Sequence, residues 1–437
     1  MKKRLTALLC AVAVTLSLTA CSKQEQNSTS TTTANSSAVS ATSTTSESVS
    51  SATSETSSVA SSDNATSSAA VSEANSATES VSSATSETSS VVSSDNANSS
   101  AAVSEANSAT ESTPETTTDI NYVLTNKNAT PEAQKVYSFI CENMGKKIIS
   151  GQQESTWAGD ETYTNKEQYE FDYIQDKTGK LPAIRGLDYM NDDFDGVNRR
   201  AKEWWEKGGI VTICWHCSCD FDRSYDECKS TEITDWGKAL TKGTDEYNKL
   251  VAGMDKGAKA LKELADANIP VLWRPFHEFD GGWFWWGKGG ADNFKKLWQL
   301  MYDRYTNHWG LNNLIWVCGF SGNGVKTDAQ KTNYADWYPG NEYVDCVGAD
   351  TYSAKGSNVD LYDEVYKVVG DSKPIPLHEC GRIPLPEDLQ TDSAKWSWFM
   401  TWHTSYATNG KSNPVERLQT IYNDDYVITL DELPKWN

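Results

Sequence analysis

Short apolar runs alternate with longer amphipathic stretches along the part of the chain from residue 119 to residue 437. Each run has four to six residues and is bounded by polar or turn-forming residues, which is typical of a strand buried on both faces. Several of the stretches between the runs carry apolar residues at helical spacing. The expected strands are 147–150, 183–187, 210–215, 271–276, 314–318, 346–349, 374–377 and 397–401, and the expected helices include 130–143, 198–207, 244–268 and 292–305.

Eight strands that alternate with helices predict an α/β protein built as a (β/α)8 TIM barrel. A doubly wound sheet is the alternative, but no glycine-rich phosphate loop follows any expected strand. About 320 residues is a normal length for one barrel of this kind. We therefore expect a single folded domain at 119–437.

The first 21 residues have the pattern of an export signal. Basic residues at 2–4 precede an apolar run at 5–18, which is too short to span a bilayer as a stable helix. The run ends in Leu-Thr-Ala-Cys at 18–21, which resembles a bacterial lipobox, and in that class Cys21 becomes the lipidated first residue. We expect 1–21 to be a lipoprotein signal peptide and Cys21 to anchor the protein at the extracellular face of the cell membrane, with ordinary secretion as the alternative.

The segment at 22–118 lacks the residues that build a core. It consists almost entirely of Ser, Thr, Ala, Asn, Val and Glu, and it contains no Trp, Tyr, Phe, Leu, Ile or Gly. Such a composition buries too little apolar surface to offset the entropy lost on ordering. Residues 50–59 recur unchanged at 82–91, again without positions that could form a core. We expect a disordered, repetitive Ser/Thr/Ala-rich linker that precedes the barrel.

The formal net charge of the chain is −21, and all 17 tryptophans lie after residue 150. An acidic surface argues against binding to nucleic acid or to anionic lipid headgroups and is compatible with a neutral polymer as substrate. We therefore expect no nucleic-acid partner, and we expect the domain to be a monomer.

One stretch, from Trp273 to Gly287, combines charged and aromatic residues at the end of an expected strand. It places Arg274, His277 and Glu278 directly before a glycine-rich segment with three tryptophans and a phenylalanine. Aromatic faces cover the apolar side of sugar rings, while charged groups bind hydroxyls and transfer protons. The stretch indicates an active site for a carbohydrate; the alternative is a buried Glu–Arg pair in an aromatic core.

Glycoside hydrolysis requires two carboxylates that flank the scissile bond. Glu278 follows the fourth expected strand and Glu379 the seventh, and the carboxyl ends of barrel strands meet at one face. A separation of about 5–5.5 Å between the two carboxyl groups would indicate a retaining enzyme. The alternative carboxylates near strand ends are Glu154, Asp188, Asp280 and Asp350.

The sequence Arg-Pro-Phe-His-Glu at 274–278, followed by Gly-Trp-Phe-Trp-Trp-Gly at 282–287, resembles the signature of glycoside hydrolase family 26, which consists chiefly of β-mannanases. One departure is Asp280-Gly281, where many members have Asn-Gly. The resemblance extends over residues 120–437. Shorter motifs that also resemble the family lie at 150–153, 215–216, 350–352 and 378–381.

This resemblance implies a retaining endo-β-1,4-mannanase that hydrolyses mannan-type hemicellulose by double displacement, with Glu278 as acid/base and Glu379 as nucleophile. It implies no cofactor and no metal. A hydrolase of another β-glycan, such as mixed-linkage glucan or xylan, and a non-catalytic sugar-binding lipoprotein are the alternatives. The expected substrate-binding residues are His216, Arg274, His277, Trp283, Asp350, Tyr352 and Trp402.

The cysteines of the expected domain allow a second kind of site. Cys214, Cys217, Cys219 and Cys228 are close enough in sequence to suggest structural zinc. However, Cys214 belongs to an expected barrel strand, so disulfides or free thiols are the preferred interpretation. The spacing does not indicate which cysteines pair.

Overall fold

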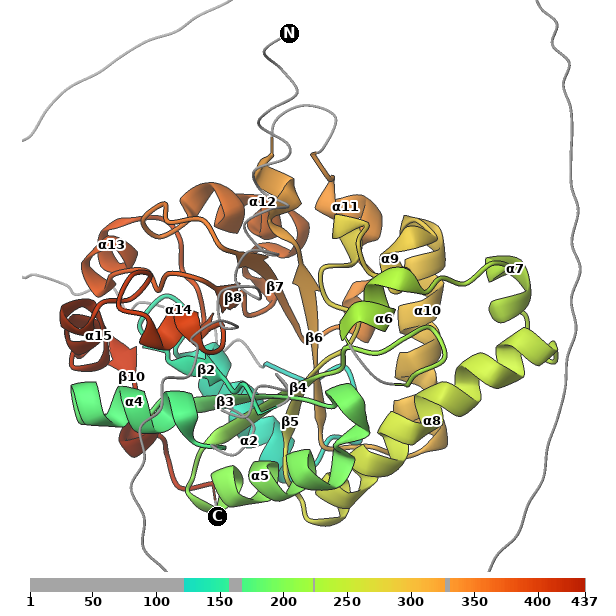
Figure 1. Ribbon diagram of the computed structural model, residues 1–437, viewed down its shortest axis with the longest axis horizontal. Coiled ribbons are helices and arrows are strands. Elements are labelled where there is room, and N and C mark those ends of the chain that lie inside the picture. The colour runs from blue at the N-terminus through green and yellow to red at the C-terminus, as the bar shows by residue number, and fades with distance from the viewer. Residues whose placement is uncertain (1–121, 157–166, 223–224, 327–330, 437) are drawn as a thin grey trace, which may run out of the picture. The chain divides into compact units, whose positions relative to one another are not determined.

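The computed structural model describes residues 122–156, 167–222, 225–326 and 331–436, so the expected signal peptide, Cys21 and the whole of the expected linker at 22–118 lie outside the described residues. Eight parallel strands, β2 to β9 in chain order, close into a barrel and confirm the predicted fold (Figure 1). The strands of the barrel are β2 (Gly151–Gln153), β3 (Ile184–Asp188), β4 (Ile210–Cys214), β5 (Val271–Arg274), β6 (Leu314–Phe320), β7 (Cys346–Thr351), β8 (Leu377–Cys380) and β9 (Phe399–Thr401).

The first barrel strand lies later in the chain than the apolar pattern predicts. Ile148 and Ile149 form β1 (Ile148–Ile149), which pairs with β10 (Val427–Ile428) in a separate two-stranded sheet. The barrel strand is instead β2, which contains Gln152 and Gln153, both buried. The run of apolar residues marks the burial of β1, whereas polar side chains inside the barrel give β2 no hydrophobic signal.

The strand expected at 374–377 also begins later, at Leu377. Pro374 and Pro376 accept hydrogen bonds through their carbonyl oxygens from the amides of Val347 and Ala349, both at 3.1 Å. Proline has no N–H to donate, so the regular ladder starts only after the second proline. Glu379 therefore lies within β8 and not beyond its end.

The helices surround the barrel, and the predicted ones are present with small shifts at their ends (Figure 1). Thr130 caps α2 by accepting a hydrogen bond from the Ala133 amide at 3.2 Å, and Thr244 caps α8 through the Tyr247 amide at 3.1 Å. No helix in the described ranges is long and apolar enough to cross a membrane. The helices are α2 (Pro131–Glu142), α4 (Tyr169–Thr178), α5 (Phe194–Glu206), α6 (Tyr225–Ser230), α7 (Trp236–Ala239), α8 (Asp245–Asp266), α9 (Trp285–Lys288), α10 (Ala291–Asp303), α11 (Tyr334–Trp337), α12 (Val359–Val369), α13 (Pro386–Thr391), α14 (Ser405–Thr408) and α15 (Val415–Tyr422).

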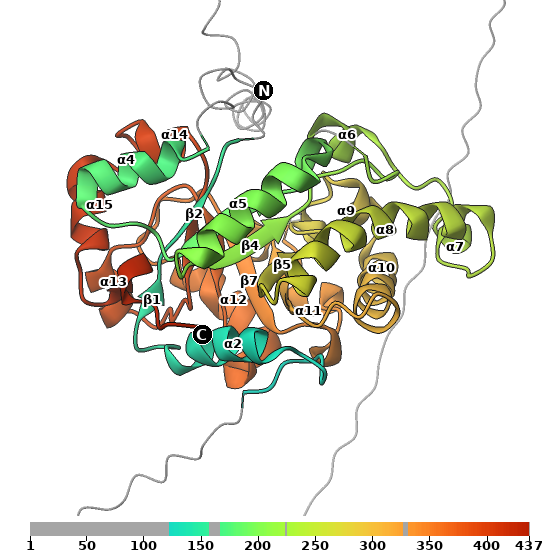
Figure 2. The same cartoon turned by 90° about the horizontal axis from the view of Figure 1, so that it is seen from below.

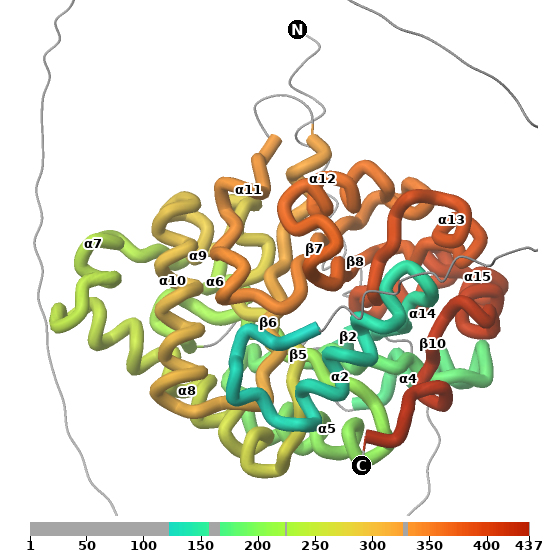
Figure 3. Tube along the Cα trace, turned by 180° about the vertical axis from the view of Figure 1, so that it is seen from behind, coloured from blue at the N-terminus to red at the C-terminus, as the bar shows by residue number. Residues whose placement is uncertain are grey.

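Helix α2 closes the amino-terminal end of the barrel, next to the C-terminal segment (Figures 2 and 3). Its apolar face joins one buried cluster with residues near the starts of several barrel strands, among them Ile184, Leu272 and Ile315. Trp436 packs edge-on against Phe139 of this helix, with 5.6 Å between ring centroids. Apolar side chains of the described residues thus fill this end, and in barrels of this kind the functional side chains lie at the opposite, carboxyl-terminal end.

A buried ion cluster ties β2 to the helical layer. The Glu154 carboxylate accepts hydrogen bonds from Arg185 (Nε at 3.0 Å and Nη2 at 2.6 Å) and from Nε of Arg200 at 2.9 Å. All three side chains are almost completely buried. Removing one member of such a cluster leaves the remaining charges without compensation in a site that water does not reach.

Glu154→Gln is therefore expected to reduce the free energy of unfolding by about 3–5 kcal/mol, because it leaves the buried guanidinium of Arg185 without its anion and leaves Arg200 only the more exposed carboxylates of Asp193 and Glu167. Thermal unfolding followed by circular dichroism measures the change. Glu142→Gln, at an exposed position on α2, is the control and should change stability little. If Glu154→Gln abolished turnover without lowering the unfolding temperature, Glu154 would belong to the reacting groups and not to the framework.

Candidate active site

Glu278 and Glu379 meet at the carboxyl-terminal end of the barrel. Glu278 lies four residues after the end of β5, and Glu379 is the third residue of β8. Carboxylate oxygens of Glu278, Glu379 and Asp350 all lie within 4.8 Å of one another. The structure thus brings together the two carboxylates that the sequence singles out, at a separation that suits attack by one and protonation by the other.

The backbone at Glu278 is held in an unusual conformation. Glu278 has φ of 52° in the left-handed region, and Phe276, two residues earlier, has the same φ. The Glu278 amide donates to the Gly319 carbonyl at 2.7 Å, which fixes the turn against β6. Residues without glycine's freedom adopt this conformation only where the surroundings enforce it, and such strain is concentrated at functional sites.

Two donors fix the Glu379 carboxylate. Nη1 of Arg274 donates to Oε1 at 2.8 Å, and the Tyr352 hydroxyl donates to Oε2 at 2.8 Å. Nη2 of Arg274 also donates to Asp350, so one guanidinium links β5, β7 and β8. This arrangement leaves Glu379 oriented toward the barrel mouth and its negative charge balanced by Arg274.

Glu278 has a different environment from Glu379. Burial, followed by the nearby negative charge of Glu379, raises the pKa of Glu278 to about 8. Trp283 opposes this shift, because its Nε1–H donates to Oε2 of Glu278 at 2.9 Å and stabilises the charged form. A carboxyl group with this pKa is protonated near neutral pH and can serve as a general acid.

Histidines and aromatic rings surround the two carboxylates. His277 is buried, and its Nε2 lies 3.6 Å from Oε1 of Glu379; burial and the positive charge of Arg274 lower its pKa well below the usual value. His216 packs edge-on against His277, with 4.5 Å between ring centroids. Trp402, just beyond β9, lies 6.4 Å from the His216 ring. A neutral His277 adds no further positive charge beside Glu379, so the charge balance there depends on Arg274.

The remaining residues expected to contact substrate also lie at this end. Tyr352 is 45% exposed, although its hydroxyl reaches Glu379. Trp283 is partly buried, and its ring centroid lies 6.2 Å from that of Phe284. Exposed or partly exposed aromatic faces beside two carboxylates are what a sugar-binding cleft requires. The structure therefore gathers all nine expected active-site residues around one barrel mouth.

Sequence reasoning missed two tyrosines in this region. Tyr225 of α6 lies 5.2 Å from the His216 ring, and burial together with the charge of Glu278 raises its pKa. Tyr406 of α14 lies 5.1 Å from the Tyr352 ring. Both tyrosines come from short helices in loops, where no apolar period or strand end marks a residue as part of the site.

The alternative carboxylates have other partners. Glu154 belongs to the ion cluster with Arg185 and Arg200. Asp280 accepts from the Ser321 amide at 2.7 Å and the Ser321 hydroxyl at 2.8 Å, and so joins the turn after β5 to the loop after β6. Asp188 accepts hydrogen bonds from Met190 and His216, and Asp350 pairs with Arg274. The four alternative carboxylates thus hold other groups in place, which leaves Glu278 and Glu379 as the pair available to a substrate.

The zinc interpretation of the cysteines gains no support. All eight cysteines in the described ranges are free, and seven of them are buried. Two groups of side chains in those ranges could hold a metal ion by distance alone: Glu278 with Asp350 and Glu379, and Asp188 with Cys214 and His216. The first group is already neutralised in part by Arg274, and Asp188 in the second already accepts three hydrogen bonds.

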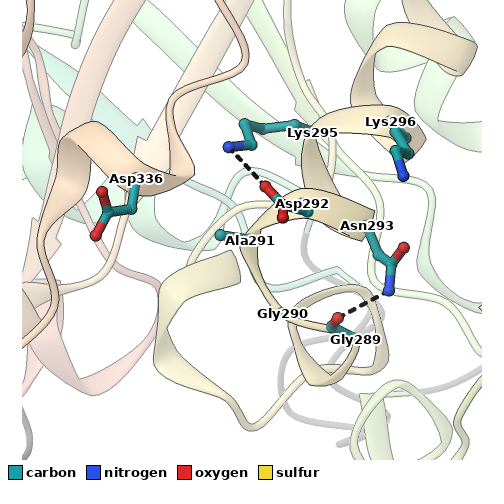
Figure 4. Close-up of a pocket in the computed structure, with 8 residues that line it drawn as sticks. All are labelled: Gly289, Gly290, Ala291, Asp292, Asn293, Lys295, Lys296 and Asp336. Atoms are coloured by element: carbon teal, nitrogen blue, oxygen red, sulfur yellow. Dashed lines mark hydrogen bonds and ion pairs between the residues drawn. The ribbon is translucent and has the colours of Figure 1, made fainter.

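A separate hollow of about 660 Å³ lies on the surface near the start of α10 (Figure 4). Its lining includes the ion pair between Lys295 and Asp292, at 3.0 Å, and a hydrogen bond from the Asn293 amide to the Gly289 carbonyl at 3.0 Å. None of the expected active-site residues lines it. This lining lacks the paired carboxylates and aromatic rings of the barrel mouth.

Comparisons with known proteins agree with this geometry. The model of glycosyl hydrolase family 26 matches residues 125–432. A mannan endo-1,4-beta-mannosidase of Thermothelomyces thermophilus is 38% identical over 322 residues; the match covers 70% of this chain and 62% of that relative, so the chain spans less than two thirds of the relative's length.

Solved structures give the same result. The crystal structure of a ruminal GH26 endo-beta-1,4-mannanase is 33% identical, with a TM-score of 0.65, over 72% of this chain and 71% of that one. A beta-mannanase from a symbiotic protist of the termite Reticulitermes speratus, solved with a gluco-manno-oligosaccharide, is 34% identical, with a TM-score of 0.63, over 72% of this chain and 99% of that one.

Proposed function

The chain belongs to glycosyl hydrolase family 26, and from this premise we propose that it is a retaining endo-β-1,4-mannanase that hydrolyses mannan-type hemicellulose. The observation that carries the proposal is the pair of carboxylates within 4.8 Å, one with a raised pKa and one held by Arg274 and Tyr352. The names of similar proteins support β-1,4-linked mannan and gluco-manno-oligosaccharide as the substrate class.

The proposed reaction has two displacements. In the first, an oxygen of Glu379 forms a bond to the anomeric carbon while the bond from that carbon to the leaving oxygen breaks, and Glu278 transfers its proton to this oxygen. In the second, Glu278 accepts a proton from water, the water oxygen bonds to the anomeric carbon, and the bond to Glu379 breaks. The net result is hydrolysis with retained configuration.

The surrounding residues support both steps. Arg274 and Tyr352 orient the Glu379 carboxylate for attack, and Trp283 keeps the Glu278 carboxyl group in place through its indole N–H. Aromatic rings at the mouth offer apolar faces to the pyranose rings. The charge that develops on the sugar in the transition state has the nearby carboxylate of Glu379 as its counterion.

The pH dependence of kcat/KM is expected to show this division of roles. The acid must carry its proton, so kcat/KM should fall about tenfold per pH unit above the Glu278 pKa of about 8. Trp283→Phe keeps a ring but removes the donor that stabilises charged Glu278, so the alkaline limb should move to higher pH. Initial rates on soluble mannan from pH 5 to 10 measure the alkaline limb in the wild type and in the variant, and a shift of this limb to lower pH in Trp283→Phe would contradict the assignment.

Parallel assays on mannan, glucomannan, lichenan and xylan test the substrate. We expect mannan and glucomannan to release reducing ends. Because internal cleavage shortens the polymer early, the viscosity of the solution should fall before most of the reducing ends appear. Cleavage confined to lichenan or xylan would contradict the mannan assignment and identify another β-glycan as the substrate. Binding of oligosaccharide without release of reducing ends would contradict the enzymatic function and favour a non-catalytic sugar-binding protein.

We also propose that the enzyme works at the extracellular face of the cell membrane as a monomer, with residues 1–21 as signal peptide, Cys21 as lipid anchor and residues 22–118 as the tether of the domain at 119–437. The lipobox-like sequence at 18–21 and the coreless composition at 22–118 support this. Cys21→Ala should move the full chain from the membrane fraction to the medium. Retention of this variant at the membrane would refute the lipid anchor.

A further inference from the structure

Asp188 lies at the end of β3, beside the strand that leads to His216. In the barrel register it pairs with Cys214, the last residue of β4, and His216 follows two residues later. The sequence presents Asp188 only as one of several alternative carboxylates. Its contacts in the structure give it a narrower role than that of a reacting group.

Three donors converge on the Asp188 carboxylate. Oδ1 accepts from the amides of Met190 at 2.9 Å and His216 at 3.0 Å, and Oδ2 lies 2.6 Å from Nδ1 of the His216 ring. Asp188 and His216 are 1% and 2% exposed, so water does not compete for these contacts. The same carboxylate therefore fixes both the backbone and the ring of His216.

This contact decides where the proton of the imidazole lies. An ionised carboxylate can only accept hydrogen bonds, so Nδ1 of His216 must be the nitrogen that carries hydrogen. In a neutral imidazole the other nitrogen, Nε2, then presents a lone pair. Among the described residues Nε2 has no hydrogen-bond partner, and the ring lies against His277 at 4.5 Å and Phe284 at 5.4 Å.

We propose that Asp188 is a positioning residue that sets the tautomer and orientation of His216, so that Nε2 accepts a hydrogen bond from a hydroxyl group of the bound sugar. The inference rests on the proposed function, because the hydroxyl is that of the substrate. A purely structural role is the competing explanation, since Asp188 also receives the Met190 amide at the start of a 3-10 turn (Met190–Asp192).

The tautomer can be read directly in solution. The full chain contains five histidines, and a histidine-labelled ¹⁵N spectrum, with His216→Ala to assign the signal, distinguishes protonated from unprotonated ring nitrogens. We expect wild-type His216 to show hydrogen on Nδ1 and a bare Nε2. Hydrogen on Nε2 alone in the wild-type spectrum would overturn the proposal, whatever the variants do.

Asp188→Asn tests the link to function. The side-chain amide can still accept from the two backbone amides, but its NH₂ group then faces Nδ1 and favours hydrogen on Nε2. We expect kcat/KM on mannan to fall by about 10- to 100-fold, which is typical when a buried hydrogen-bonding group, here the sugar hydroxyl that faces Nε2, is left without its partner. In the same variant, the ¹⁵N spectrum of His216 should show hydrogen on Nε2 and an unprotonated Nδ1.

A double-mutant cycle separates positioning from structure. If Asp188 acts through His216, then Asp188→Asn in a His216→Ala background should change kcat/KM by no more than about twofold. Asp345→Asn is the matched control, because Asp345 is buried and accepts the amides of Thr125 (2.7 Å) and Trp316 (2.8 Å) away from the barrel mouth. This control should lower the unfolding temperature with kcat/KM within about twofold of wild type.

Additive effects of Asp188→Asn and His216→Ala, or an unchanged kcat/KM in Asp188→Asn, would overturn the proposal. A chain that cleaves none of the four polysaccharides would refute the proposed function instead, and the ¹⁵N spectrum would still report the tautomer of His216. The two failures are therefore distinguishable.

Discussion

Replacing Glu379 by Ala is expected to lower kcat on mannan by roughly 10⁴-fold or more, because the variant lacks the proposed nucleophile. Arg274 would keep Asp350 as a partner, so the barrel should remain folded. Reducing-end assays on polysaccharide, together with circular dichroism of the variant, measure the two effects. Cleavage of mannan at the wild-type rate would show that another group is the nucleophile.

Azide sharpens the test of Glu379. In Glu379→Ala the space left by the side chain admits a small anion, which can attack the anomeric carbon from the same face. An activated aryl β-mannobioside should then yield the α-glycosyl azide, with inverted configuration. Asp280→Asn is the control, since that carboxylate contacts Ser321 and not the reacting pair. Formation of the β-azide by Glu379→Ala would contradict the assignment.

Replacing Glu278 by Ala has the second-largest expected effect, and it depends on the leaving group. On mannan, kcat/KM should fall about 10²- to 10⁴-fold, because Glu278 is the proposed donor of the proton that the departing hydroxyl needs. A dinitrophenyl β-mannobioside leaves without protonation, so its first step should stay close to the wild-type rate. Stopped-flow release of the phenol measures this step separately from turnover.

The second step of the reaction gives an independent check on Glu278. Without a general base, water attacks the intermediate slowly, so the phenol should appear in a burst followed by slow turnover. Azide needs no base, and it should raise turnover of Glu278→Ala and give the β-glycosyl azide. Equal losses on mannan and on the activated substrate, with no burst, would assign Glu278 to a structural role.

The barrel itself could be predicted because most of its strands appear as short apolar runs in the sequence. Runs such as 210–215 and 314–318 are apolar on both faces, as strands covered by helices must be. The same reasoning failed for β2 and for the start of β8. There the deciding features were buried polar side chains and two prolines, whose effects depend on neighbouring strands.

The candidate site could be predicted only in part, because some of its residues lie in loops that carry no local sequence pattern. The sequence supplied the signature from Arg274 to Gly287 and a second glutamate at a strand end, which is enough to name the two carboxylates. It did not show that Tyr225 and Tyr406 join the site, because short helices in loops carry no periodic pattern.

By itself, the sequence determined the barrel, the choice of Glu278 and Glu379 as the proposed carboxylate pair, and the family resemblance, because each follows from local pattern or contiguous motif. Only the tertiary structure decided the environment of each group: Arg274 reaches Glu379 across 105 residues of sequence, and Asp188 reaches the His216 ring across 28. The proximity of charges and the exclusion of water set the pKa of Glu278, and both arise only when the strands close into a barrel.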